Sequence, residues 1–437
     1  MDLTVNPGGV TTRGFFMSDH YKLQDVAASI HRDYQFLTEA EIENIKAGIL
    51  PRICNCHKAP QEGSLKAGIG EMQIWKGDDS AHFRGLQSCG SVWACPHCGS
   101  KIANFRADEV KRGSQIYLDR DDKNCLVMVT FTIPHVYSDS LDILYSRFMK
   151  ARRLLRQQKP LKRKKMLVWS ELMDGWATHG QIAAIEATYS DRNGWHPHSH
   201  DLLMVSRDVS QKDIENYQTQ IAEAWLYACK RSKLFIPKEK DFLKHSVQVE
   251  RMKSVNDYLC KLSDLDTEAR QKEITEIKRC CNERWNHADE ICRANSKHSR
   301  SAKGITPFDM LRLIEASPGD DEIYKKYGRL YRQFTRVMFG KRQIFWSKGL
   351  KTDLGVLDIS DQDIADAHEE VGAQYFMSIN MEIWRVVLTM GLRSYLKEIA
   401  VTWSRDKIED WLTSLWRTHG QGKDDYQQAG ERMASCA

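Results

Sequence analysis

The chain has 437 residues, and its 64 lysines and arginines against 59 aspartates and glutamates give a formal net charge of only +5. This length allows two or three domains with a sizeable core, and so small a net charge does not by itself indicate a nucleic-acid-binding protein. No apolar run reaches the length of a membrane span, no hydrophobic signal segment opens the sequence, and 12 cysteines are present. We therefore expect a cytoplasmic protein in a reducing compartment, with no membrane partner.

A cysteine pattern follows a mixed N-terminal segment of residues 1–50, which includes a helical stretch at 39–49. A C-x-x-C pair presents two thiolates to one tetrahedral ion, and further cysteines upstream can complete a structural zinc site. The expected ligands are Cys56, Cys89, Cys95 and Cys98, with Cys54 and His57 left open as alternatives to Cys56. A redox C-x-x-C is the competing interpretation, but it leaves Cys89 without a role. Residues 51–118 are therefore predicted to form a zinc-binding module that ends in a helix over 101–117.

Hydrophobic patterns and capping residues predict alternating strands and helices from residue 119 to residue 270. Strands are expected at 125–133, 181–189, 194–205 and 246–251, and helices at 141–155, at 211–230 and from 254 onward. The turn residues of 191–194 join the second and third strands into a hairpin. The order strand, helix, strand, strand, helix, strand is a split β-α-β arrangement with an antiparallel sheet, in which the third strand lies centrally.

The third strand carries the most informative pattern of the chain, three histidines at alternate positions in GWHPHSHDLLMV. Alternate residues of a strand share one face, so His196, His198 and His200 are expected to stand together. The hairpin would bring Glu186 close to them. Imidazole is the commonest metal ligand, which predicts a divalent metal site; the alternative is a histidine-rich surface strand.

A tyrosine follows the last strand, in the helix that carries Asp257-Tyr258-Leu259-Cys260-Lys261. The phenolate of Tyr258 can attack a phosphodiester and form a covalent intermediate, and Lys261, one turn later, can offset charge on the phosphate. Taken alone, Tyr258 is more often a packing residue. Beside a metal strand, it becomes a candidate nucleophile.

Two basic stretches and a helical end complete the chain. Nine lysines and arginines lie in KARRLLRQQKPLKRKK (150–165), which fits either a solvated helix face or a tether that can follow a phosphate backbone. Residues 271–351 are predicted to be a basic helical extension, whose interleaved aromatics we expect to be the buried face of a helix rather than a base-stacking surface. Residues 352–437 are predicted to be helical, with tryptophans that pack in a core. A second zinc site at Cys280, Cys281, His287 and Cys292 is a weaker possibility, because adjacent thiolates bind one ion awkwardly.

These residues together resemble the HUH endonucleases, in the branch of rolling-circle plasmid replication initiators. The resemblance rests on three motifs, at 127–133, at Glu186 with 194–200, and at 258–261. The segment CGSVWACPHCGSKI resembles the cysteine module ahead of the nuclease in that branch, and 306–311 and 340–350 resemble its downstream part.

The resemblance implies an α+β fold: an HUH nuclease domain with a ferredoxin-like antiparallel sheet and packed helices, preceded by a small zinc module and followed by a helical C-terminal region. It implies a metal-dependent endonuclease and strand transferase that nicks one strand of origin DNA, single-stranded or in a hairpin. Tyr258 would become linked to the 5′ phosphate, and a free 3′ hydroxyl would prime synthesis. Mg²⁺ or Mn²⁺ would serve catalysis, zinc would be structural, and host replication proteins such as a helicase would be partners.

Carried over by residue, the histidine pair falls on His198 and His200 and the acidic ligand on Glu186. The extra histidine of the motif falls on His196, which would lie beside the ligands without binding the ion. Ser199 stands where a bulky apolar residue is usual. Ser254 stands where some initiators carry a carboxylate that activates water for termination, and Asp257 and Glu250 are the possible substitutes. Two other functions remain open, an HUH transposase or relaxase-like strand transferase and a non-enzymatic zinc-dependent DNA-binding repressor.

Overall fold

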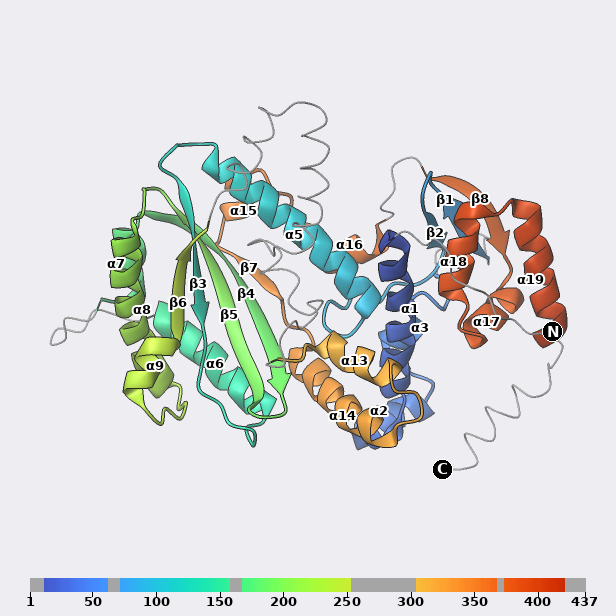
Figure 1. The fold of residues 1–437 in the computed structure, drawn as a ribbon, viewed down its shortest axis with the longest axis horizontal. Coiled ribbons are helices and arrows are strands. Elements are labelled where there is room, and N and C mark those ends of the chain that lie inside the picture. The colour runs from blue at the N-terminus through green and yellow to red at the C-terminus, as the bar shows by residue number, and fades with distance from the viewer. Residues whose placement is uncertain (1–11, 62–70, 158–166, 253–303, 368–372, 421–437) are drawn as a thin grey trace. The chain divides into compact units, whose positions relative to one another are not determined.

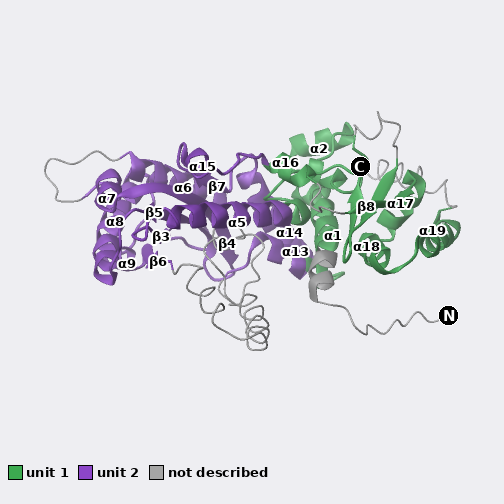
Figure 2. Cartoon of the chain, turned by 90° about the horizontal axis from the view of Figure 1, so that it is seen from above, with its two compact units in different colours: residues 1–98, 314–320, 361–437 green, residues 99–313, 321–360 purple. Residues whose placement is uncertain are grey.

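The computed structural model describes residues 12–61, 71–157, 167–252, 304–367 and 373–420, with only the backbone described for 12–19 (Figure 1). The chain divides into two compact units, each built from segments far apart in the sequence (Figure 2). Unit 1 comprises residues 1–98, 314–320 and 361–437, and unit 2 comprises residues 99–313 and 321–360. Unit 1 thus combines the N-terminal and C-terminal parts of the chain, whereas the five segments expected from the sequence are consecutive.

Unit 2 is built on a five-stranded antiparallel sheet with the strand order β6-β3-β5-β4-β7 (Figure 1). Its strands are β3 (Cys125–Phe131), β4 (Thr178–Ser190), β5 (Gly194–Val205), β6 (Val247–Arg251) and β7 (Ile344–Trp346). Its helices are α6 (Leu141–Arg156), α7 (Trp169–Gly175), α8 (Gln211–Arg231), α9 (Glu239–His245), α14 (Asp321–Met338) and α15 (Leu350–Asp353), with most of α5 (Pro96–Leu118) and α13 (Pro307–Glu315).

The order of the first four strands confirms the expected split β-α-β arrangement, since β3 and β4 lie on either side of β5. The histidine strand β5 is central, as predicted. The prediction that 271–351 is wholly helical is wrong at β7, which pairs with Ile182, Ala183 and Ala184 on β4. This pairing satisfies backbone groups that β4 would otherwise leave open at the edge of the sheet.

Each face of the unit 2 sheet packs against helices. On one face, Leu202 and Met204 continue the histidine row into a core cluster with Val110 and Tyr117 of α5. On the other face, α6 and α8 pack, and Trp225 of α8 is fully buried beside Phe131 of β3. The sheet is therefore held from both sides, and its histidines stand on the α5 face. Tyr327, Tyr331 and Phe334 of α14 are buried, as expected for the buried face of a helix, whereas Phe339 just after the helix is exposed.

Unit 1 is a three-stranded antiparallel sheet, β2-β1-β8, packed with helices. Its elements are α1 (Thr12–Ile30), a 3₁₀ turn (Tyr34–Phe36), α2 (Glu39–Lys46), α3 (Arg52–Asn55), β1 (Met72–Lys76), β2 (Ala81–Arg84), α16 (Asp361–Asp366), β8 (Gln374–Ile379), α17 (Met381–Thr389), α18 (Arg393–Thr402) and α19 (Arg405–His419).

Residues 352–437 were expected to be helical, and β8 corrects that expectation. Gln374–Ile379 pairs with β1, because alternate residues Met377 and Ile379 fill the same core as Met72 and Ile74. The helices α17, α18 and α19 do form, and Trp384 is fully buried in that core. Among the residues that the structure describes, no helix is both long and apolar enough to span a membrane.

Candidate active site and metal centres

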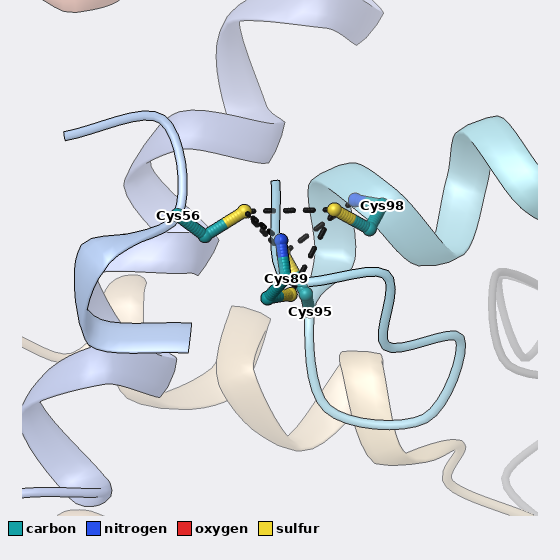
Figure 3. A group of neighbouring side chains, drawn as sticks. All are labelled: Cys56, Cys89, Cys95 and Cys98. Atoms are coloured by element: carbon teal, nitrogen blue, oxygen red, sulfur yellow. Dashed lines mark hydrogen bonds between the residues drawn. The ribbon is translucent and has the colours of Figure 1, made fainter. Parts of the chain in front are cut away.

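Four cysteines of unit 1 gather into one buried cluster, Cys56, Cys89, Cys95 and Cys98 (Figure 3). The sulfur–sulfur distances are 3.8 Å for Cys56–Cys95, 3.5 Å for Cys56–Cys98 and 3.7 Å for Cys89–Cys98. Four sulfurs each about 2.3 Å from a tetrahedral zinc ion lie about 3.8 Å apart. The thiols therefore have the number, chemistry and spacing that a structural zinc ion needs.

Local backbone turns deliver these thiols to one point. Cys56 ends the short helix α3, and Cys98 lies in the first turn of α5. The backbone N–H of Cys89 donates to Cys56 Sγ at 3.3 Å, and that of Cys98 donates to Cys95 Sγ at 3.5 Å. Gly90 has φ +64°, and a Cβ there would lie 2.4 Å from Gln362 Oε1. The bend beside Cys89 therefore requires glycine.

The two alternative fourth ligands lie outside the cluster. Cys54 is buried, but its thiol is directed to the carbonyl of Ala28 at 3.8 Å. The ring of His57 packs on that of His97, with 4.0 Å between the centroids. The structure thus groups Cys56, and neither of these two, with the three downstream cysteines.

A polar shell that the sequence does not reveal surrounds the cysteines. Gln24 of α1 is fully buried and donates from Nε2 to Cys95 Sγ at 3.4 Å. Arg393 of α18, 1% exposed, donates to Gln24 Oε1 at 2.6 Å and to Asp25 at 2.7 Å. The C-terminal part of the chain therefore orients a group that contacts the cysteine cluster. Glutamine and arginine carry no local signal of such a role, since the contact joins residues more than 360 positions apart.

The second group lies in unit 2 and joins Glu186 of β4 with His198 and His200 of β5. Glu186 stands directly opposite His198 in the hairpin register. Its Oε2 lies 3.3 Å from His198 Nε2 and 3.7 Å from His200 Nε2, and all three side chains are largely buried. Two imidazole nitrogens and one carboxylate oxygen thus converge on one point, as the sequence pattern predicts.

Each of the two histidine rings has a hydrogen-bond partner at Nδ1, on the side away from Glu186. His198 Nδ1 is 3.1 Å from the carbonyl oxygen of His196, which can only accept, so Nδ1 carries the proton. His200 Nδ1 is 3.1 Å from the hydroxyl of Thr130, the residue opposite it on β3. The His198 proton at Nδ1 leaves a lone pair on Nε2 directed toward Glu186, and the Thr130 hydroxyl, when it accepts from His200 Nδ1, gives His200 the same form. This is the arrangement that neighbouring groups impose on histidine ligands of metals.

The first histidine of the row has different surroundings. His196 Nδ1 lies 3.3 Å from His135 Nδ1, and the structure does not group His196 with Glu186, His198 and His200. Burial, together with the neighbouring His198 and His135 rings, lowers the pKa of His196 to about 3. His196 is therefore neutral near pH 7. The sequence analysis did not single out His135. Its position four residues after the end of β3 is the signal that could have placed it near the histidine strand.

A buried charge pair supports the histidine strand from the opposite face of the sheet. Arg152 of α6 donates to Asp201 at 2.8 and 3.0 Å and also to the hydroxyl of Ser199. Arg156 adds a further contact to Asp201 at 3.0 Å. Ser199 is thus held by a hydrogen bond from Arg152 beneath the histidine strand. Arg152 and Arg156 of the 150–165 basic run therefore bind Asp201, and Arg152, which is buried, does not form part of a solvated helix face.

Several predicted residues lie outside the described part of the chain: Tyr258, Lys261, Ser254, Asp257, Cys280, Cys281, His287 and Cys292. Glu250 is described. It is exposed on β6 and pairs in register with Met128, which in turn pairs with Leu202 on the histidine face. Its carboxylate therefore belongs to the same face of the sheet as the metal ligands.

Comparison with known proteins finds a similarity to a Streptomyces lividans protein described as "Protein rep", 25% identical over 337 residues. The match spans 64% of this chain and 66% of that protein, just under two thirds of its length. A shorter similarity, 25% identity over 140 residues, joins 28% of this chain to 31% of a Streptomyces cyanogenus "Neomycin resistance protein". No protein-family model matches the chain, and no solved structure matches it.

Proposed function

We propose that the protein is a rolling-circle plasmid replication initiator of the HUH superfamily, which nicks one strand of single-stranded or hairpin origin DNA. The observation that carries the proposal is the group formed by Glu186, His198 and His200, in which two Nε2 atoms and one carboxylate oxygen lie close together. The strand order around it is that of a ferredoxin-like sheet, and the similarity to "Protein rep" supports the class of protein.

The proposed reaction is a transesterification in which Tyr258 is the nucleophile. Its phenolic oxygen forms a bond to phosphorus, the bond between phosphorus and the 3′ oxygen breaks, and the proton lost by the tyrosine is balanced by one gained at the 3′ hydroxyl. Lys261 offsets charge on the phosphate. A divalent ion held by Glu186, His198 and His200 would polarise the phosphate and stabilise the leaving oxygen. Because the donors are two nitrogens and one oxygen, Mn²⁺ suits them better than Mg²⁺, which prefers oxygen.

The cysteine cluster is proposed to hold zinc with a structural role. All four ligand positions of a tetrahedral ion are taken by protein sulfur, so no position is left for a substrate. Zinc would stabilise unit 1, and through it the binding of origin duplex. A host helicase is the expected partner after nicking, when the strands must be separated.

The test uses end-labelled single-stranded oligonucleotides that tile both strands of the DNA flanking the gene, with Mn²⁺. We expect one oligonucleotide to be cut, with its 3′ fragment linked covalently to the protein and its 5′ fragment ending in a hydroxyl. Peptide mapping should place the link on Tyr258, and Tyr258→Phe should bind the DNA without forming the adduct. Tyr137→Phe is the matched control, because Tyr137 is 63% exposed and lies against Gly194 of the histidine strand.

Three outcomes contradict different parts of the proposal. An adduct mapped to Tyr137, or one that persists in Tyr258→Phe, overturns the assignment of the nucleophile. Cutting by hydrolysis with no adduct indicates a metal nuclease that uses water. If none of the tiled oligonucleotides is cut, the proposal of a replication initiator is overturned. A zinc-dependent DNA-binding repressor is then the better account.

A further inference from the structure

His135 and His196 form a pair beside the metal ligands that the proposed nicking reaction does not use. Their ring centroids are 4.6 Å apart, and both side chains are partly exposed. Neither belongs to the group of Glu186, His198 and His200, whose ligand atoms lie within 4.8 Å of one another. The proposed nicking reaction therefore assigns no role to this pair of histidines at the edge of the candidate metal site.

The backbone brings the two rings together at one glycine. Gly194, at the start of β5, has φ +75°, and a Cβ there would lie 3.0 Å from both the Cα and the carbonyl oxygen of Tyr137. The segment after His135 can therefore lie directly on the strand that carries His196 only because residue 194 has no side chain. This close approach sets the Nδ1 atoms 3.3 Å apart.

The hydrogen bonds of the pair assign its protons. His135 Nδ1 lies 3.2 Å from the carbonyl oxygen of Ile133, and a carbonyl only accepts, so His135 Nδ1 carries the proton. His196 Nδ1 faces that N–H and must accept, which leaves Nε2 as the ring nitrogen of His196 that carries the proton. His198 has the reverse form, with its proton on Nδ1 and its lone pair on Nε2. Within one row, the ligand presents a lone pair and its neighbour presents an N–H.

We propose that His196, held by His135, donates a hydrogen bond from Nε2 to a non-bridging phosphate oxygen of the bound DNA strand, and is neither a third metal ligand nor half of a second cation site. The inference rests on the proposed function, because a DNA strand at the metal is what brings a phosphate to this edge. Among the described residues, the structure gives His196 Nε2 no acceptor, which leaves that N–H available to a ligand.

The test measures metal and DNA binding separately, in the Tyr258→Phe background so that no strand is cut. The probe for the metal is Mn²⁺, titrated calorimetrically. The probe for DNA is the fluorescent single-stranded oligonucleotide of the tiled set that the Tyr258→Phe protein binds most tightly, in its normal form and with single methylphosphonate linkages that each remove one phosphate charge. The variants are His196→Leu, which removes the donor, and His196→Gln, whose amide N–H reaches a similar position; His179→Gln, on β4 beside Asp353, is the control.

We expect His196→Leu to weaken DNA binding about tenfold, the size of one hydrogen bond to a charged acceptor, with Mn²⁺ affinity unchanged. His196→Gln should restore most of that binding, and His135→Phe should weaken it less than His196→Leu does. One methylphosphonate position should weaken the unchanged protein but not His196→Leu, since the two changes remove the same contact.

Loss of Mn²⁺ binding in His196→Leu comparable to that in His198→Ala would make His196 a ligand and overturn the inference. A second Mn²⁺ per chain that disappears in His135→Phe would make the pair a cation site, which also overturns it. Equal DNA affinity in all variants would likewise overturn the inference. These readouts do not depend on cleavage, so a protein that never forms an adduct fails the proposed function without deciding this one.

Discussion

The two candidate metal centres differ in a way that predicts different roles. The cysteine centre of unit 1 takes all its ligands from sulfur, and all four residues are buried. The Glu186–His198–His200 centre of unit 2 offers three ligands, and the side chain of His198 is 13% exposed. A four-coordinate closed site holds a fold together, whereas a three-ligand site leaves positions for water or substrate. The number of ligands and their accessibility therefore separate the two roles.

The centres also differ in how the chain builds them. The histidine centre comes from one hairpin, and its ligands on β4 and β5 are only 12 residues apart across the turn from Glu186 to His198. The cysteine centre joins segments 33 residues apart in Cys56 and Cys89, and the shell around it includes Arg393. Metal binding at the histidine centre therefore depends mainly on one hairpin. Metal binding at the cysteine centre depends on segments that are far apart in the chain.

The largest expected effect comes from removing one ligand of the closed centre, the four-cysteine cluster of unit 1. Cys95→Ser or Cys98→Ser should release zinc and unfold unit 1, because the binding energy of a structural zinc, on the order of 10 kcal/mol, is folding energy. Elemental analysis and thermal unfolding measure both effects. Cys54→Ser is the matched control, since Cys54 is also buried but its thiol is directed to the carbonyl of Ala28. Protein purified without chelators and found free of zinc would contradict the closed centre.

Substitutions in the open centre, the group of Glu186, His198 and His200, should abolish nicking without changing the stability of the fold. His198→Ala or His200→Ala should lower the nicking rate at least about a thousandfold, the scale of losing metal-ion stabilisation, while DNA binding and the melting temperature stay near those of the unchanged protein. EDTA should likewise stop nicking, and added Mn²⁺ should restore it. Nicking at near-normal rates in both variants would show that the histidine strand is not the metal site.

The support beneath the histidine strand should act on stability. Arg152→Met leaves Asp201, which is 1% exposed, with Arg156 as its remaining partner. Removing one member of a buried pair costs about 3–5 kcal/mol, so chemical denaturation should show unit 2 destabilised by about that amount, with zinc content unchanged. Arg152→Met combined with Asp201→Leu should recover part of the loss. A single variant as stable as the unchanged protein would mean that the pair contributes little.

The smallest effect should come from the partner of His200. Thr130→Val keeps the shape of the side chain but removes the hydroxyl 3.1 Å from His200 Nδ1. Loss of such an orienting contact lowers metal affinity about 10-fold to 100-fold, and Mn²⁺ titration should show a change near the lower value with no loss of stability. Thr188→Val, on β4 opposite His196, is a suitable control. An unchanged Mn²⁺ affinity would mean that Thr130 does not fix the ring.

Much of the histidine centre could be predicted from the sequence because its pattern is local. Alternation over 194–205 and the turn before it fix both the shared face and the position of Glu186 opposite His198. The parts that were missed depend on contacts between distant residues. β7 and β8 are short strands that complete sheets begun far upstream, and Asp201 and Arg152 pair across 49 residues. Spacing within a strand or helix carries no information about such partners.

The most direct test of two distinct centres is anomalous diffraction from crystals of the full chain grown with Mn²⁺. We predict a zinc peak among the sulfurs of Cys56, Cys89, Cys95 and Cys98. We also predict a manganese peak within bonding distance of the Nε2 atoms of His198 and His200 and of a carboxylate oxygen of Glu186, with His196 outside the coordination sphere. A manganese ion bound through Nδ1, a third histidine ligand at His196, or no metal between β4 and β5 would contradict the account.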